Sequence, residues 1–131
     1  MKQTLKQFIK FGIVGFLSFL VDAGIYLIVT RYLFVFYIIA KMISFVLAAT
    51  NSYIFNRAWT FRSKNAQIGQ EFSKFFIISA IGLGLNSLIM FLAVDKIKLH
   101  DLVSLVIATA LTMFWNFTAN KFWTFRERQA V

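Results

Sequence analysis

Residues 75–94 read FFIISAIGLGLNSLIMFLAV, twenty consecutive residues without a charged side chain. An α-helix rises about 1.5 Å per residue, so about twenty apolar residues cross the roughly 30 Å hydrocarbon layer of a membrane. Three further stretches have this length and character: residues 11–30, 37–56 and 102–120. The absence of proline fits unbroken helices whose backbone groups are all bonded internally. The sequence therefore predicts an all-α integral membrane protein with four transmembrane helices.

The composition of the whole chain supports this class. Hydrophobic residues make up 60% of the 131 residues and charged residues 15%, whereas soluble domains average about 45–50% and about 25%. The net charge is +9, but no solvated domain is left to present it to a nucleic acid, so we expect no nucleic-acid partner. Because the chain has no cysteine, one histidine and five scattered acidic residues, we expect no metal site, no cofactor and no enzymatic activity.

The distribution of lysine and arginine predicts the orientation. Cytoplasmic segments of membrane proteins carry an excess of these residues. Ten lie before the first span, between the second and third spans, or after the fourth: Lys2, Lys6, Lys10, Arg57, Arg62, Lys64, Lys74, Lys121, Arg126 and Arg128. Four lie on the other side: Arg31, Lys41, Lys96 and Lys98. Both termini and the central loop are therefore expected in the cytoplasm.

The two halves of the chain align without a gap when one is shifted by 64 residues. NRAWTFR at 56–62 matches NKFWTFR at 120–126 with five identities and an Arg/Lys exchange. Upstream, Phe8, Lys10 and Phe11 match Phe72, Lys74 and Phe75. We therefore predict a single membrane domain over residues 1–131, built from two tandem helical hairpins at about 8–62 and 72–126. Because each copy crosses the membrane twice, the copies should be parallel repeats related by an axis along the membrane normal.

Each predicted span carries one face of small or polar side chains, spaced three or four residues apart as on one side of a helix. The four sets are Gly15, Ser18, Asp22 and Tyr26; Ser44, Ala48, Ser52 and Asn56; Ser79, Gly82, Asn86 and Met90; and Ala108, Thr112, Asn116 and Asn120. Such faces are typical of close helix packing, and they can also line a polar route. Asp22 is an ionisable group near mid-span, which indicates a polar cavity or a partner. A hydrogen-bonded structural role is the alternative, since Asn86 is its equivalent.

Six cations are expected at the cytoplasmic membrane face: Lys10, Arg57, Arg62, Lys74, Lys121 and Arg126. They can set the topology, with Trp59 and Trp123 as interfacial anchors. They can also attract anionic lipids in bulk, or form a specific receptor for the phosphate of one lipid. The sequence leaves these interpretations open.

At these residues the chain resembles the GtrA-like family of small four-span bacterial membrane proteins. The resemblance covers nearly the whole chain. It is carried by KFGIVG at 10–15, by Asp22, and by the blocks NRAWTF at 56–61 and NKFWTF at 120–125. The blocks recur at matching span ends, which makes them more specific than the apolar bulk.

The resemblance implies a flippase-type function in the bacterial cytoplasmic (inner) membrane. Family members are thought to translocate a polyprenyl-phosphate-linked monosaccharide, such as undecaprenyl phosphate glucose, for a separate membrane glycosyltransferase that builds cell-surface polysaccharide. We expect the headgroup path to include Ser18, Asp22, Ser52, Asn56, Asn86, Asn116 and Asn120, and the six cations to bind the phosphate. No nucleotide-binding motif is present, so ATP is not expected to drive the movement.

Two other functions fit the same sequence. The chain could be a membrane scaffold that recruits a glycosyltransferase without moving lipid, or a small cation exporter that uses Asp22. The cation cluster favours an anionic substrate over a cationic one. A bundle of four helices is thin, so we also expect a homo-oligomer, most simply a dimer.

Overall fold

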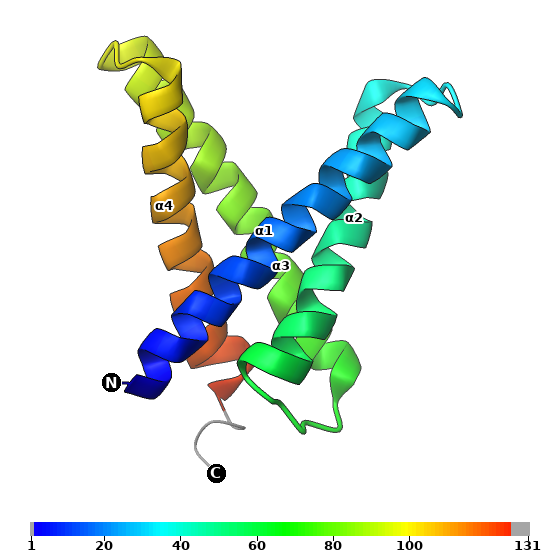
Figure 1. The fold of residues 1–131 in the computed structure, drawn as a ribbon, viewed down its shortest axis with the longest axis vertical. Coiled ribbons are helices and arrows are strands. Elements are labelled where there is room, and N and C mark those ends of the chain that lie inside the picture. Colours follow the sequence, from blue (N-terminus) through cyan, green and yellow to red (C-terminus); the bar gives the residue numbers. More distant parts are fainter. Residues whose placement is uncertain (1, 127–131) are drawn as a thin grey trace. The chain divides into compact units, whose positions relative to one another are not determined.

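The computed structural model describes residues 2–126, which are helical apart from short connections (Figure 1). The helices are α1 (Lys2–Arg31), α2 (Tyr37–Phe55), α3 (Ile68–Phe91) and α4 (Asp101–Ala119), with π-helical turns η1 (Asn56–Thr60), η2 (Leu92–Lys96) and η3 (Asn120–Thr124). Within the described residues, four helical segments are long and apolar enough to cross a membrane. The all-helical class with four spans is thus confirmed. Glu127 and Arg128, which entered the acid and charge counts, lie outside the described residues.

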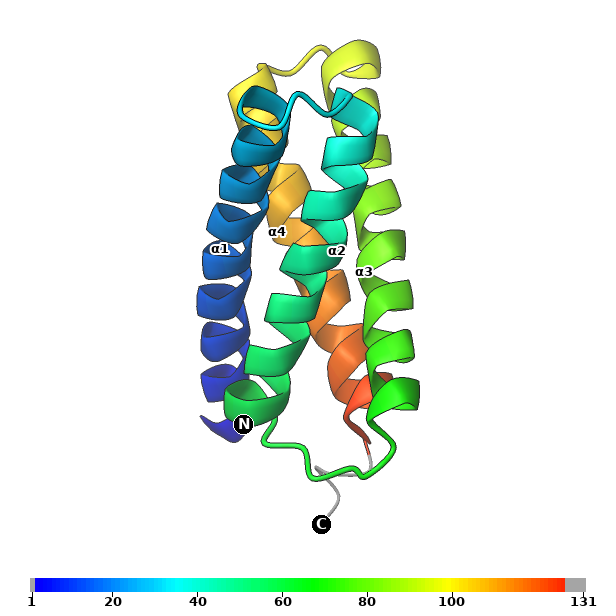
Figure 2. The same ribbon diagram turned by 90° about the vertical axis from the view of Figure 1, so that its right-hand side faces the viewer.

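The chain divides into two compact units, Met1–Lys64 and Asn65–Val131, which we call hairpin 1 and hairpin 2. In hairpin 1, α1 packs along α2, and in hairpin 2, α3 packs along α4 (Figure 2). Small residues allow this approach: Ala40, Ser44 and Ala48 on α2 are buried, as are Ser104 and Ala108 on α4. The packing interpretation of the small-residue faces is therefore confirmed for Ser44, Ala48 and Ala108.

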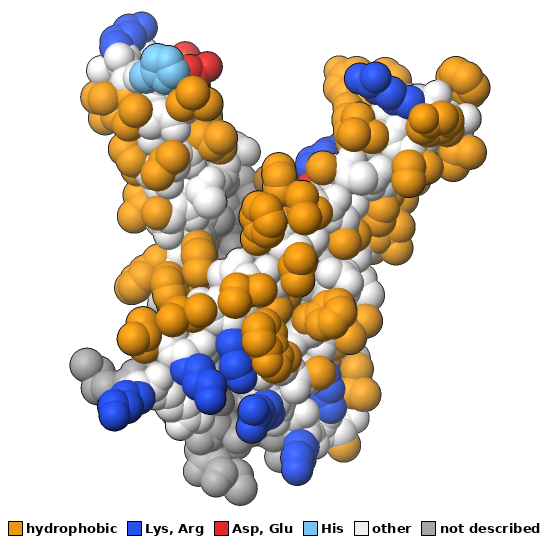
Figure 3. Space-filling model, viewed as in Figure 1, with side chains coloured by type: hydrophobic (Ala, Val, Ile, Leu, Met, Phe, Trp, Pro, Cys, Tyr) orange, Lys and Arg blue, Asp and Glu red, His pale blue; other side chains and the backbone are white. Residues whose placement is uncertain are grey.

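Two helices begin earlier than the apolar stretches suggested. The first span was predicted from residue 11 and the third from residue 75, but α1 begins at Lys2 and α3 at Ile68. Most polar side chains of the added turns are exposed, although Gln7 and Glu71 are buried. Helices tolerate polar side chains outside the hydrocarbon, and a hydropathy pattern does not report such turns. Figure 3 shows Lys and Arg side chains gathered over the first turns of α1 and hydrophobic side chains along its remaining length.

The second helix of each hairpin ends in a π-helical turn. The Phe61 N–H donates to the Asn56 carbonyl over 2.9 Å, and the Phe125 N–H donates to the Asn120 carbonyl over the same distance. These bonds span five residues, so one extra residue is accommodated before the chain leaves the helix. The turn thereby changes the direction of the side chains that follow it.

A side-chain hydrogen bond holds each of these two turns. Thr60 Oγ1 donates to Asn56 Oδ1 over 2.7 Å, and Thr124 Oγ1 donates to Asn120 Oδ1 over 2.7 Å. Asn56 and Asn120 are fully buried. Because a buried amide without partners is costly, these bonds explain why the two asparagines are accommodated there.

The residue after each turn points back onto the first helix of its hairpin. Phe61 packs edge-on against Phe11, and Phe125 packs edge-on against Phe75. Both pairs have ring centroids 6.3 Å apart and an interplanar angle of 64°. Edge-to-face packing is a favoured aromatic geometry, so these pairs close the end of each hairpin opposite its connecting loop.

The connections between the helices also match at an offset of 64 residues. Phe34 and Lys98 have left-handed backbone conformations, with φ of 56° and 68°. Next to them, the Val35 N–H donates to the Val29 carbonyl over 3.2 Å, and the Leu99 N–H donates to the Ala93 carbonyl over 2.9 Å. Equivalent residues therefore make equivalent contacts at both ends of the two hairpins.

Candidate functional site

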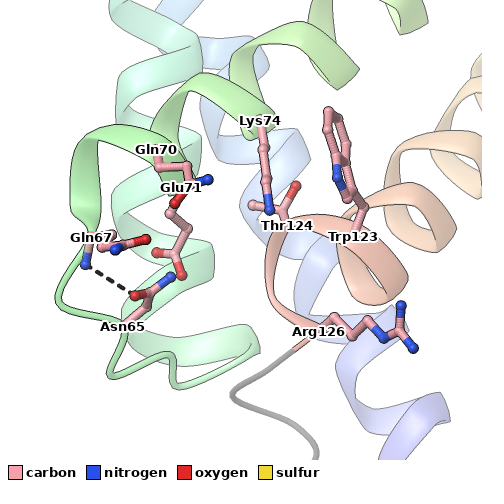
Figure 4. A pocket seen from close by; sticks show the side chains of 8 residues that line it. All are labelled: Asn65, Gln67, Gln70, Glu71, Lys74, Trp123, Thr124 and Arg126. Carbon is pink, nitrogen blue, oxygen red and sulfur yellow. Dashed lines mark hydrogen bonds between the residues drawn. The ribbon is translucent and has the colours of Figure 1, made fainter.

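A polar pocket lies at the end of hairpin 2 where α3 begins and η3 ends (Figure 4). Its volume is about 200 Å³. It is lined by Asn65, Gln67, Gln70, Glu71, Lys74, Trp123, Thr124 and Arg126. All eight residues belong to hairpin 2, so this hairpin forms the pocket by itself.

One face of α3 supplies much of the lining. Gln67, Gln70, Glu71 and Lys74 are separated by three, one and three residues, which places their side chains on one side of the helix. Asn65 Oδ1 accepts a hydrogen bond from the Gln67 N–H over 3.0 Å, which fixes the loop that leads into the helix (Figure 4). The pocket therefore combines a carboxylate, an amide and a cation on the helix with two further amides, Asn65 and Gln67, from the residues just before it.

The turn η3 supplies the opposite wall. The Lys74 ammonium lies 5.4 Å from the centre of the Trp123 ring, a cation–π contact. In Figure 4 Lys74 also reaches toward Thr124, whereas the guanidinium of Arg126 extends away from Glu71. The pocket thus has a cationic and aromatic side and a side with carboxylate and amides, an arrangement suited to a ligand that carries both a phosphate and hydroxyl groups.

The matching end of hairpin 1 shares only part of this chemistry. Lys10 lies 5.2 Å from the centre of the Trp59 ring, as Lys74 does from Trp123. However, Gln7 stands where hairpin 2 has Glu71, and Lys6 stands where hairpin 2 has Gln70. This end of hairpin 1 is consequently richer in positive charge and lacks the carboxylate.

The six predicted phosphate-binding cations are divided between the hairpins. Lys74 and Arg126 line the pocket of hairpin 2. Arg57 Nη1 donates a hydrogen bond to Ser63 Oγ over 3.4 Å. The positive charges of Lys10 and Arg62 repel each other in the same hairpin. Lys121 lies within η3 and is not among the residues that line the pocket. Two of the six predicted phosphate-binding cations therefore line the pocket.

The predicted path asparagines at the ends of the second and fourth spans are bonded within their own helices. Asn56 Nδ2 donates to Ser52 Oγ over 3.2 Å, and Asn120 Nδ2 donates to the Asn116 carbonyl over 2.7 Å. Their other amide atoms accept from the threonines described above. In this conformation Asn56 and Asn120 stabilise the turns and face no open space.

Two other predicted path residues join neighbouring helices. Ser18 Oγ accepts from Asn51 Nδ2 over 3.3 Å, which links α1 to α2. Asn86 Nδ2 donates to Thr112 Oγ1 over 3.4 Å, which links α3 to α4. Such hydrogen bonds hold membrane helices together.

Asn116 is the one member of the predicted path whose amide oxygen is buried without a hydrogen-bond partner among the described residues. It packs against Gly82, where an added Cβ would lie only 2.6 Å from Asn116 Oδ1. Gly82 therefore provides the space that this amide occupies.

Asp22 has a partner, one of the two surroundings that its position in the sequence indicated. Its Oδ2 lies 2.7 Å from Lys41 Nζ, in an ion pair between α1 and α2. The sequence alone did not pair these two residues, and no site role was predicted for Asn51, Gln67, Gln70 or Glu71. The spacing of Gln67, Gln70, Glu71 and Lys74 was the available signal for the pocket.

These features define a small helical membrane protein with a polar pocket at one end of a hairpin. The chain belongs to the family described as GtrA/DPMS, transmembrane domain, which matches residues 10–125. It is 32% identical over 127 residues to the uncharacterized membrane protein YngA of Bacillus subtilis (strain 168), covering 97% of this chain and 84% of that protein. The resemblance to the GtrA-like family is thereby confirmed.

Proposed function

We propose that this protein translocates a polyprenyl-phosphate-linked monosaccharide, such as undecaprenyl phosphate glucose, across the bacterial cytoplasmic membrane. Membership of the GtrA/DPMS family is consistent with this general class of function. The observation that carries the proposal is the hairpin 2 pocket, in which Lys74 and Arg126 accompany amides and a carboxylate. Cations bind the phosphate, while amide and carboxylate groups bind sugar hydroxyls and the Trp123 ring supports a sugar face.

The size of the pocket fits a headgroup. Pockets that enclose whole drug-sized ligands measure about 300–1,000 Å³, and this pocket measures about 200 Å³. The polyprenyl tail can stay in the bilayer, so only the phosphate and the hydroxyls need polar partners. The pocket then acts as the cytoplasmic capture site.

The proposal includes the topology predicted from the sequence. The hairpins are tandem copies of one ancestral unit, supported by the π-helical turns, aromatic pairs and Lys–Trp contacts that recur 64 residues apart. Both termini and the central loop face the cytoplasm, because these segments carry most of the lysine and arginine residues of the chain. A homo-oligomer shields the headgroup in transit and delivers it to a membrane glycosyltransferase on the outer side.

A cation exporter fits the structure less well than a carrier of anionic lipid. Such an exporter would need Asp22 to bind a cationic substrate or a proton, and Lys41 already neutralises this carboxylate at 2.7 Å. The cations at the pocket would repel a cationic substrate.

Native mass spectrometry of the protein purified from its membrane tests the proposed substrate class. We expect the wild-type chain to retain a lipid with the mass of a polyprenyl phosphate hexose, because the capture pocket binds both phosphate and hydroxyls. Lys74→Gln should lose most of this lipid. The control is Lys64→Gln, which removes an exposed charge outside the pocket and should retain it. If the wild type and both variants carried bulk phospholipid and no polyprenyl phosphate hexose, the proposal would be contradicted.

A further inference from the structure

Hairpin 1 contains a second polar site near its 32–36 connection, at the end opposite the lysine-rich start of α1. Asp22 lies nine residues before Arg31, so it is about 13 Å from that end of α1. Lys41 lies one turn after Tyr37, where α2 begins. The Asp22–Lys41 ion pair therefore lies within the membrane-spanning part of the hairpin, toward the connection.

This ion pair leaves polar atoms available. Asp22 Oδ1 is buried and has no hydrogen-bond partner among the described residues. The Lys41 ammonium carries three N–H donors, and it donates one of them to Asp22 Oδ2 over 2.7 Å. The Lys41 side chain is 51% exposed. One acceptor and further donors at the ion pair are therefore not used by the described residues.

A pocket of about 360 Å³ lies at the pair. It is lined by Phe19, Asp22, Ala23, Tyr26, Tyr37 and Lys41. Apart from the ion pair and the tyrosine hydroxyls, these walls are apolar. A bound molecule has to satisfy an ammonium and a carboxylate oxygen together, since polar groups in apolar surroundings are costly when unpaired. A phosphate ester with a neighbouring hydroxyl does so, because phosphate accepts from Lys41 and the hydroxyl donates to Asp22 Oδ1.

The equivalent positions of hairpin 2 carry no charge. Asn86 stands in place of Asp22, and Leu105 stands in place of Lys41. The ion pair is thus particular to hairpin 1, just as the carboxylate of the capture pocket, Glu71, is particular to hairpin 2. This difference argues against a role that both hairpins share, such as packing.

We propose that the Asp22–Lys41 pocket is a release site that binds the phosphosugar headgroup at the outer side of the membrane. This inference rests on the proposed function for the identity of the headgroup. Lys41 donates to the phosphate, and Asp22 accepts from a sugar hydroxyl. Asp22 also competes with the phosphate for the Lys41 charge, which keeps the affinity low and lets the lipid leave.

Binding of undecaprenyl phosphate glucose to the protein in nanodiscs tests this inference. All proteins carry Lys74→Gln and Arg126→Gln, so that the capture pocket does not obscure the result. Adding Asp22→Asn should tighten binding at least about fivefold, because an amide no longer neutralises Lys41. Adding Lys41→Leu, alone or together with Asp22→Asn, should abolish this binding. Unchanged or weaker binding after Asp22→Asn would overturn the inference.

The substitutions copy residues that the chain already holds at equivalent positions, Asn86 and Leu105, so folded variants are expected. Nanodiscs with phosphatidylglycerol, whose headgroup has a phosphate and hydroxyls, identify the source of the ligand. The Asp22→Asn protein should bind the sugar lipid more tightly than phosphatidylglycerol. Equal affinity for the two lipids would assign the pocket to ordinary lipid and overturn the inference.

Comparing these binding data with leaflet exchange in liposomes separates this inference from the proposed function. Tighter binding after Asp22→Asn, with no wild-type lipid movement between leaflets, would refute translocation and leave the binding site standing. Lipid movement by the wild type without any effect of Asp22→Asn would refute the release site alone.

Discussion

Lys74→Gln combined with Arg126→Gln is expected to lower the affinity for undecaprenyl phosphate glucose at least about a hundredfold, because each charge-assisted hydrogen bond contributes about 1.5–3 kcal/mol. Both cations line the hairpin 2 pocket, and Lys74 is positioned there by the Trp123 ring. Titration of the lipid into nanodiscs measures the loss. Wild-type affinity should also fall more steeply with added salt than that of the variant, since salt screens interfacial charge.

The matched control for this prediction lies in hairpin 1. Lys10→Gln combined with Arg62→Gln removes the equivalent charges, where Gln7 replaces the pocket carboxylate. This double substitution should change the affinity by less than about threefold, because it only lowers the positive charge of the protein surface. Equal losses from the two double variants would mean that the cations attract anionic lipid diffusely, and the capture pocket would have to be abandoned.

Phe125→Ala is expected to lower the free energy of unfolding by about 3–5 kcal/mol, the usual cost of replacing a buried phenylalanine by alanine. The Phe125 side chain is fully buried, and its ring packs edge-on against Phe75. The substitution leaves a cavity at the end of hairpin 2, between α3 and η3. Denaturant unfolding in detergent micelles, followed by circular dichroism, measures the loss.

Phe122→Ala is the control for the stability prediction. Phe122 is three residues away in the chain, but its side chain is 63% exposed. The Phe122→Ala variant should have the same free energy of unfolding as the wild type, because the substitution removes little apolar surface from a packed environment. If Phe125→Ala and Phe122→Ala unfolded alike, the aromatic pair would not be a stabilising contact of the hairpin.

The four spans could be predicted from the sequence because the membrane demands long apolar stretches, and residues 75–94 satisfy this requirement without tertiary information. Two helix starts could not, since Lys2 and Ile68 begin turns that continue outside the hydrocarbon. The π-helical turns were also missed. They depend on a hydrogen bond between side chains, such as Thr60 to Asn56, which hydropathy does not report.

The two polar sites were only partly predictable. Lys74 and Arg126 were identified as phosphate ligands, but Gln67, Gln70 and Glu71 lie before the third apolar stretch and received no role. Their spacing indicated a polar helix face, yet the residues opposite it come from η3, about fifty positions later in the sequence.

The pairing of Asp22 with Lys41 depends on how α1 and α2 are rotated against each other. A single sequence shows an ionisable group on each helix but not which sides of the helices meet. Asp22 was therefore predicted to face a polar cavity or to have a partner, while the identity of that partner required the structure.

The most direct test of the proposed function is leaflet exchange of undecaprenyl phosphate glucose by the purified protein in liposomes without ATP. We expect a protein-dependent exchange that saturates with lipid, because the headgroup has to occupy a binding pocket. The rate should fall toward that of empty liposomes for Lys74→Gln combined with Arg126→Gln. If the wild-type protein, folded and inserted, exchanged this lipid no faster than empty liposomes, translocation would be contradicted and a scaffold for a membrane glycosyltransferase would take its place.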